Sequence, residues 1–263
     1  MIPGPTLQHA PQAWGRAILR SVSSWWHLLH FAAIVGVLVL SPSTYRHDNR
    51  AATSRYIYAS TWQVLPWFTV LAALLSLVLI RIVVVTALSY GLSQYALQMV
   101  VRVLVLELIP LSAALFVTLR AGLSLQMMAP VTPSAVAAPE LSLELLCKDV
   151  VPRVLATTVS VLALTMVSSV IALVLAYLTV HGFTLWGLPG YTRTVGKVFD
   201  PAVTAGFALK AVAFSLAVAI VPIAAGLEEA RQPRQANTVQ AGAVRLFLVL
   251  LWIEAASLVV KYI

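Results

Sequence analysis

Long uninterrupted apolar segments dominate the chain, and five of them exceed the roughly 20 residues that an α-helix needs to cross the hydrocarbon core of a membrane. Residues 154–180 contain no charged side chain, and residues 62–80 contain none either. A transmembrane β-barrel would instead alternate apolar and polar residues over segments of about 10 residues. The pattern therefore predicts transmembrane helices at residues 62–89, 95–120, 154–180, 201–227 and 239–262.

The N-terminal segment, residues 11–40, has a different pattern. Arg16, Arg20 and His27 alternate with tryptophan and aliphatic residues. Basic residues interleaved with Trp-rich apolar surface are typical of a helix that lies in the headgroup region. The apolar end of this segment is short for a span, so we predict an interfacial helix at residues 11–40 whose end dips into the membrane. A sixth span at residues 25–40 is the alternative.

Composition places the whole chain among membrane proteins. It is 60% hydrophobic and only 10% charged, whereas soluble proteins carry roughly 25% charged residues. With a mean hydropathy of +0.93, the chain has more apolar surface than a soluble fold of this length could bury. We therefore predict a single all-α integral membrane domain over residues 1–263.

The basic residues are distributed unevenly about the predicted spans. Lys and Arg outnumber Asp and Glu by 17 to 9, for a net charge of +8, which in a soluble protein would suggest nucleic-acid binding. Segments on one predicted side hold Arg16, Arg20, Arg46, Arg50, Arg55, Arg120, Lys148, Arg153, Arg231 and Arg234. The other side holds Arg193, Lys197 and Lys261. Because cytoplasmic loops are enriched in Lys and Arg, we predict a cytoplasmic N-terminus in a bacterial inner (cytoplasmic) membrane.

Familiar catalytic motifs are absent from the sequence. Neither H-E-x-x-H nor G-x-S-x-G occurs, and the Gly-Lys pair at residues 196–197 lacks the Ser or Thr that follows in a P-loop. His27 and His30 could share a metal ion, but a pair that faces the headgroups is the better interpretation. The single cysteine, Cys147, excludes an intramolecular disulfide bond. We therefore expect no catalytic residue, metal or bound cofactor in this chain.

Three charged residues lie deep within different predicted spans. At 1.5 Å of rise per residue, Glu107, Lys210 and Glu254 lie roughly 20–24 Å from the cytoplasmic ends of their helices. An isolated charge at that depth costs at least about 2.5–3.5 kcal/mol, so we predict that the three meet in one buried polar cluster, either functional or purely structural. Pro110 cannot donate a hydrogen bond to the carbonyl of Leu106, and it is expected to open the helix beside Glu107.

Two acids and one lysine leave this predicted cluster with an excess negative charge. We therefore expect one of the two acids to carry a proton at neutral pH. The alternative is a second cation, and the candidate that we consider is Arg102, five residues outward of Glu107. Its long side chain could span the ~7.5 Å of helix rise between the two residues.

The segment between the second and third predicted spans has two parts. Residues 126–139 are rich in Pro and Ala and form a predicted loop. Residues 140–153 form a predicted short helix, on which Glu140, Glu144 and Lys148 recur every four residues as one polar stripe. On the residues alone, an interfacial loop helix is the safer interpretation.

Residues 107–122 read ELIPLSAALFVTLRAG. This segment resembles the signature of the Mla/Mce-type ABC permease family (MlaE-like proteins), Arg-Glu-Leu-Gly-Pro followed by apolar turns and Gly-Arg-Ala-Gly. The positions in register are Glu107, Pro110, Ala113, Ala114, Arg120, Ala121 and Gly122. Similar positions elsewhere are Glu144, Asp149, Arg153, Lys210, Phe214, Gly226 and Glu254. Leu106 and Ile109 stand where the family has Arg and Gly, and residues 126–139 replace the family's Glu-Gly segment and Glu-Gln pair.

The resemblance implies the permease subunit of a lipid ABC transporter, working as a homo- or heterodimer with cytoplasmic ATPase subunits that bind ATP and Mg²⁺. It also implies a periplasmic Mce-domain lipid-binding protein, and phospholipid or another hydrophobic molecule as the substrate. The helix at residues 140–153 then becomes a coupling helix that docks into the ATPase. Its contact residues would be Glu140, Glu144, Lys148, Asp149 and Arg153. A proton-coupled secondary carrier that uses Glu107 and Glu254, or a non-transporting membrane anchor subunit, remains the alternative.

Overall fold

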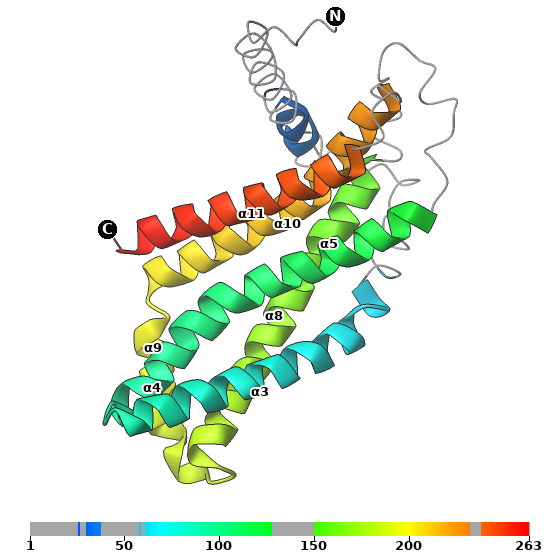
Figure 1. Cartoon of the computed structure of the whole chain (residues 1–263). Helices are drawn as coiled ribbons and strands as arrows, with labels where there is room; N and C mark the ends of the chain where they lie inside the picture. Colours follow the sequence, from blue (N-terminus) through cyan, green and yellow to red (C-terminus); the bar gives the residue numbers. More distant parts are fainter. Residues whose placement is uncertain are drawn as a thin grey trace, which may run out of the picture.

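The computed structural model of the chain describes residues 26, 30–37, 58, 61–127, 150–231 and 238–262. These residues are helical apart from short turns (Figure 1), and no strand occurs among them. The principal elements are α3 (Leu65–Ser89), α4 (Ser93–Val100), η3 (Val101–Leu108), α5 (Ile109–Met127), α8 (Val151–His181), η5 (Leu185–Gly187), α9 (Leu188–Val198), α10 (Pro201–Arg231) and α11 (Thr238–Tyr262). Of these, η3 is a π-helix and η5 a single 3₁₀ turn.

Within this described part, five helical stretches are long and apolar enough to cross a membrane, which confirms the predicted all-α membrane fold. They are Leu65–Ser89, Tyr95–Arg120, Val151–His181, Pro201–Gly226 and Gly242–Lys261. The second is composite, because α4, η3 and α5 follow one another without a break. Most of the predicted interfacial helix at residues 11–40 lies outside the described residues. Residues 30–37 are helical, and the buried Val35 packs against α8 and α10.

Two elements differ from the sequence-based expectation. Arg153 lies in the first turn of α8, which begins at Val151 with Pro152 at a position that suits proline, rather than in a separate helix over residues 140–153. Residues 140–149 lie outside the described part of the chain. From the sequence, Gly187, Pro189, Gly190 and Gly196 predict a loop at residues 181–200. This prediction is wrong in part, because the segment contains η5 and the 11-residue helix α9.

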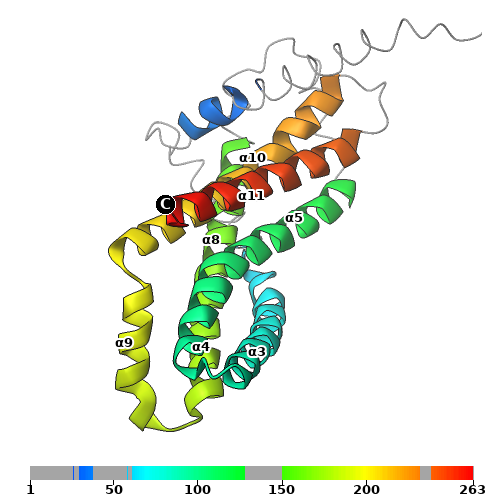
Figure 2. The ribbon, with the colours of Figure 1, turned by 60° about the vertical axis from the view of Figure 1, so that its left-hand side comes forward.

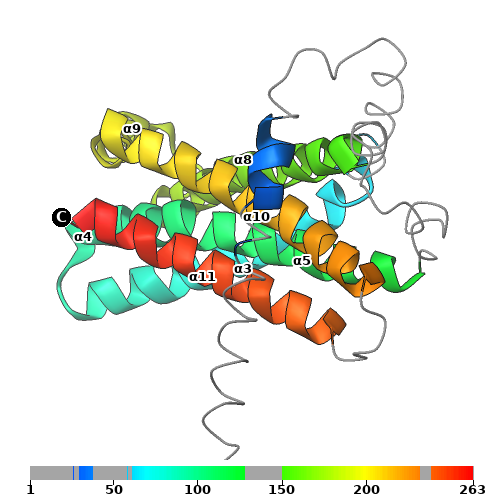
Figure 3. The same cartoon turned by 90° about the horizontal axis from the view of Figure 1, so that it is seen from above.

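The helices pack around α8, which is contacted by α3, α5 and α10, and α11 packs on α10 (Figures 1 and 2). Figure 3 shows α10 and α11 running side by side. Close approach of helices in lipid depends on small residues at the interfaces. The small buried residues of α3, α5, α8 and α10 include Ala72, Ser76, Ala113, Ala114, Ser168, Ala172, Ala176, Ala211 and Ser215. Gly242 of α11 lies so close to α10 that a Cβ added there would lie 2.9 Å from Ala225.

The outward faces of the membrane-spanning helices carry many large apolar side chains. On α3 the exposed side chains include Leu71, Leu74, Val78 and Ile82. A soluble protein rarely exposes so continuous an apolar surface, whereas a membrane-spanning helix is solvated there by lipid. Among the five spans α11 is the least buried, and it packs mainly against α10.

Candidate functional site

Lys210 lies within α10 among apolar and small residues, and it is 4% exposed. One turn further along the helix, the ring of the fully buried Phe214 has its centroid 5.6 Å from Lys210 Nζ, within cation–π distance. The apolar neighbours favour helix and burial, but a buried ammonium group also requires acidic partners.

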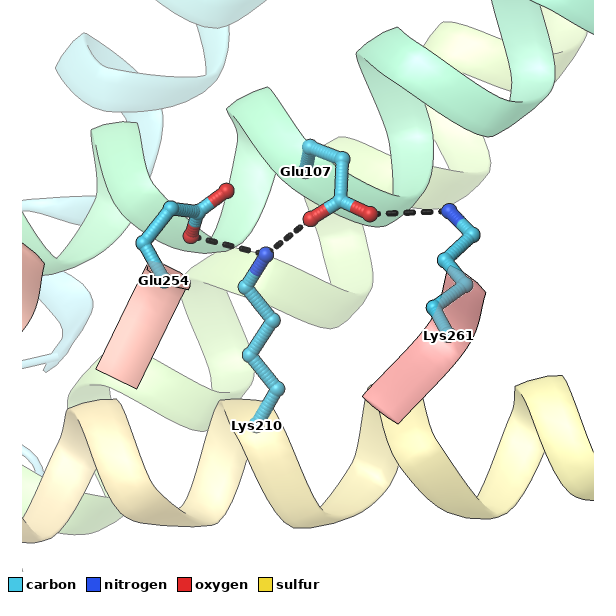
Figure 4. Close-up of polar contacts among 4 residues, drawn as sticks. All are labelled: Glu107, Lys210, Glu254 and Lys261. Carbon is cyan, nitrogen blue, oxygen red and sulfur yellow. Dashed lines mark hydrogen bonds and ion pairs between the residues drawn. The ribbon is translucent and has the colours of Figure 1, made fainter. Parts of the chain in front are cut away.

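The partners are Glu107 of η3 and Glu254 of α11 (Figure 4). Lys210 Nζ donates a hydrogen bond to Glu107 Oε2, and Glu254 Oε2 lies 2.7 Å from the same nitrogen. The second contact is an ion pair. The three residues come from three separate elements and meet in one cluster, as their similar depths along the predicted spans had indicated.

A fourth member, Lys261, was missed by the sequence reasoning. Its Nζ donates a hydrogen bond of 2.8 Å to Glu107 Oε1 from the last turn of α11. The sequence placed Lys261 among the outer basic residues because it lies at the end of its span. A usable signal was present: Lys261 follows Glu254 by seven residues, or two helical turns, which places both on one face of α11.

The four residues form a chain of alternating charge in the order Glu254, Lys210, Glu107 and Lys261, which we call the charge chain (Figure 4). The side chains of Glu107, Glu254 and Lys261 are 14%, 19% and 18% exposed, and that of Lys210 only 2%. Two acids therefore face two cations, and the premise that one lysine faces two acids is wrong. Arg102 is exposed, and no ion pair joins it to Glu107 in the described structure.

The helix around Glu107 is wider than an α-helix. Residues Val101–Leu108 form a π-helix, and the N–H of Ile109 donates to the carbonyl of Leu104, five residues back. Pro110 follows immediately and is buried. Because proline has no N–H to donate, the α-helical pattern cannot continue backward through this position. π-Helical turns occur frequently at functional sites, and this one sets the position from which Glu107 meets two lysines.

The other residues selected from the sequence lie away from the charge chain. Arg120, exposed in α5, donates a hydrogen bond of 3.0 Å to Gln63 Oε1 just before α3. Gly122 lies two residues further along α5, and Arg153 is partly buried in α8. The predicted ATPase-coupling residues outside the described part are Glu140, Glu144, Lys148 and Asp149.

The charge chain can couple the positions of helices. It joins η3, α10 and α11 through three contacts, so moving one of these elements against the others separates at least one ion pair. The described residues contain no group of three His, Cys, Asp or Glu that could hold a metal ion.

Comparison with known proteins identifies the family. The family model of the permease MlaE matches residues 53–260, which include four of the five spans in full, the fifth up to Val260, and three of the four members of the charge chain, Glu107, Lys210 and Glu254. No curated protein and no solved structure matches the chain. Since the match covers most of the sequence, the chain belongs to the MlaE permease family.

Proposed function

We propose that the chain is the permease subunit of an ABC transporter that moves phospholipid or another hydrophobic molecule between the bacterial inner membrane and a periplasmic Mce-domain protein. The observation that carries this proposal is the family match over residues 53–260, which covers α3 through α10 and α11 up to Val260. The apolar outer faces of α3 and α11 support a site of action within the membrane.

ATP hydrolysis belongs, in this proposal, to a separate cytoplasmic subunit. The sequence carries no P-loop of its own, and a dimer of permease subunits would dock on two ATPases. The docking residues are Glu140, Glu144, Lys148, Asp149 and Arg153. Arg153 lies at the start of α8, the helix at the centre of the bundle, so movement of this segment would be transmitted directly to α3, α5 and α10.

The charge chain has a part in this mechanism. Nucleotide-driven movement has to displace helices without leaving a bare charge in lipid, which would cost several kcal/mol. Glu107 and Lys210 each have two partners, so either can give up one contact and keep the other. Charges that share their partners in this way suit a transporter that changes conformation better than a single rigid salt bridge would.

The test is recovery of the ATPase with the permease. An N-terminally tagged chain, purified in mild detergent from its source organism, should retain an ATP-hydrolysing subunit. Exchanging the charges by Glu144→Lys with Lys148→Glu keeps the i,i+4 spacing of opposite charges on the helix predicted from the sequence but presents reversed charges to the partner. We expect this variant to insert and to lose the ATPase.

The matched control is Arg193→Glu with Lys197→Glu, which alters two exposed charges on α9. It should retain the ATPase, because α9 lies at the opposite end of the bundle from the start of α8 (Figure 1). ATPase retained by the Glu144/Lys148 variant would contradict the coupling assignment. A chain that yields no ATPase in any form would contradict the proposed function itself.

A further inference from the structure

The connection between α8 and α9 presents the two most exposed large apolar side chains of the described structure, Phe183 and Trp186, with the exposed Leu185 between them. Phe183 is 93% exposed, Leu185 79% and Trp186 96%. We call these three residues the aromatic tip. Side chains of this size normally lose water when a protein folds, because burying their apolar surface is favourable. Their common exposure on one six-residue connection therefore needs a partner surface.

Hydrogen bonds hold the connection in a fixed shape. Gly182 has a positive φ of 67°, and its N–H donates to Leu178. The hydroxyl of Thr184 donates to the carbonyl of His181 at 2.8 Å. The hydroxyl of Tyr177 donates to the carbonyl of Thr184. The backbone is thus tied down on both sides of Phe183, and this side chain is held away from the bundle.

An aromatic group beneath the connection completes this support. The Tyr177 and His181 rings stack at 5.2 Å, and the Tyr191 ring meets Tyr177 edge-on at 5.1 Å. Gly187 lies directly on His181, where an added Cβ would be 2.2 Å from the imidazole Cδ2. Tyr191 donates a hydrogen bond of 2.7 Å to the carbonyl of Leu173. The aromatic tip is therefore displayed by a packed scaffold.

The length of α8 places this scaffold at a membrane surface. Its 31 residues give a helix of ~46 Å, whereas a bilayer with its headgroup regions is about 40–45 Å thick. With Val151 at one headgroup region, His181 reaches the other. The positive-inside rule assigns this second surface to the outer side.

The neighbouring surface has the chemistry of a lipid interface. Met166, Val170 and Val174 are exposed at four-residue spacing along α8 and form an apolar stripe that runs toward the tip. Beyond the tip, Arg193 and Lys197 are exposed on α9. Tryptophan is enriched where membrane meets water, and basic residues beside apolar ones strengthen binding to anionic lipid.

We propose that the aromatic tip inserts into the boundary between headgroups and acyl chains of the outer leaflet, and so fixes the depth of α8 and α9. The partner is the lipid surface itself rather than another protein. This inference rests on the fold and the orientation, and it does not depend on the transport activity.

Fluorescence quenching in liposomes tests the proposal. Cys147→Ser removes the only native thiol, after which Phe183→Cys or Leu185→Cys accepts an environment-sensitive fluorophore. We expect nitroxide lipids labelled near the headgroup to quench either fluorophore more strongly than lipids labelled near the chain end. Val170→Cys, in the apolar stripe, is the matched control and should show the reverse order.

Aqueous iodide supplies the opposing result. The proposal would be overturned if iodide quenched the fluorophore as readily as free dye in both variants, at position 183 and at position 185, and neither nitroxide lipid quenched it. Protection that appears only in native membranes and disappears in pure liposomes would assign the tip to a partner protein, which also overturns it. Far-UV circular dichroism of each labelled chain establishes that the helices remain intact.

Discussion

Replacing Lys261 with methionine tests whether the charge chain has a second cation. The change keeps a long, flexible side chain and removes the positive charge from Glu107 Oε1, 2.8 Å away. Glu107 then depends on Lys210 alone, and Lys210 also serves Glu254. We expect Lys261→Met to weaken the attachment of α11, the least buried span.

The expected magnitude follows from burial. Removing one partner of a well-buried ion pair costs about 3–5 kcal/mol, which applies to Lys210 with its side chain 2% exposed. Lys261 is 18% exposed, and its loss leaves Glu107 with one cation. For this residue the range for a hydrogen bond to a charged group, about 1.5–3 kcal/mol, is appropriate. The predicted order of damage is Lys210→Met, then Lys261→Met.

Reversible unfolding in mixed detergent micelles, followed by far-UV circular dichroism, measures these free energies. Lys197→Met, at an exposed position on α9, is the matched control and should change stability by no more than about 0.5 kcal/mol. In a Glu107→Gln background the effect of Lys261→Met should shrink, because the two residues interact directly. If Lys261→Met costs no more than Lys197→Met, the charge chain ends at Glu107 and our reasoning is refuted.

Three further predictions concern orientation, the outer end and the π-helix. A membrane-impermeant maleimide should label Cys147 in lysed spheroplasts but not in intact ones, and ready labelling of intact ones would reverse the orientation. Burial raises the pKa of the Tyr191 hydroxyl to about 12. The contribution of the neutral hydroxyl to stability should therefore be complete below pH 10 and lost as the pH rises through about 12. A Tyr191→Phe variant whose alkaline unfolding curve is unchanged would contradict this. Pro110→Ala restores an N–H that can bond the carbonyl of Leu106 and should shift Glu107 away from Lys210, with lower transport despite normal insertion; unchanged transport would show that the π-helix is dispensable.

Hydropathy alone was sufficient to locate the spans, because lipid imposes one simple requirement on every helix that crosses it. Depth along the helices was sufficient to group Glu107, Lys210 and Glu254, since a charge at mid-membrane depth needs a partner. The same rule misplaced Lys261: a lysine at a helix end can extend to the headgroups, and nothing local shows that it turns inward. Only its seven-residue spacing from Glu254 carried that information.

Two local structures, α9 and the π-helix η3, were not predicted from the sequence, for different reasons. Gly187, Pro189, Gly190 and Gly196 made residues 181–200 look like a loop, yet Tyr191 and Val198 are buried and hold α9 in the fold. Here tertiary packing overrode weak helix propensity. The π-helix of η3 depends on a hydrogen-bond register that no residue pattern specifies, and the sequence indicated only that Pro110 would disturb the helix.

Transport of labelled phospholipid in liposomes tests the central claim most directly. The tagged chain, purified with its bound partners and reconstituted, should transfer a fluorescent phospholipid to acceptor protein when ATP and Mg²⁺ are present. Transfer should stop with a non-hydrolysable ATP analogue and should fall in Lys210→Met but not in Lys197→Met. Transfer that proceeds without ATP and follows an imposed proton gradient would contradict the account and support a secondary carrier.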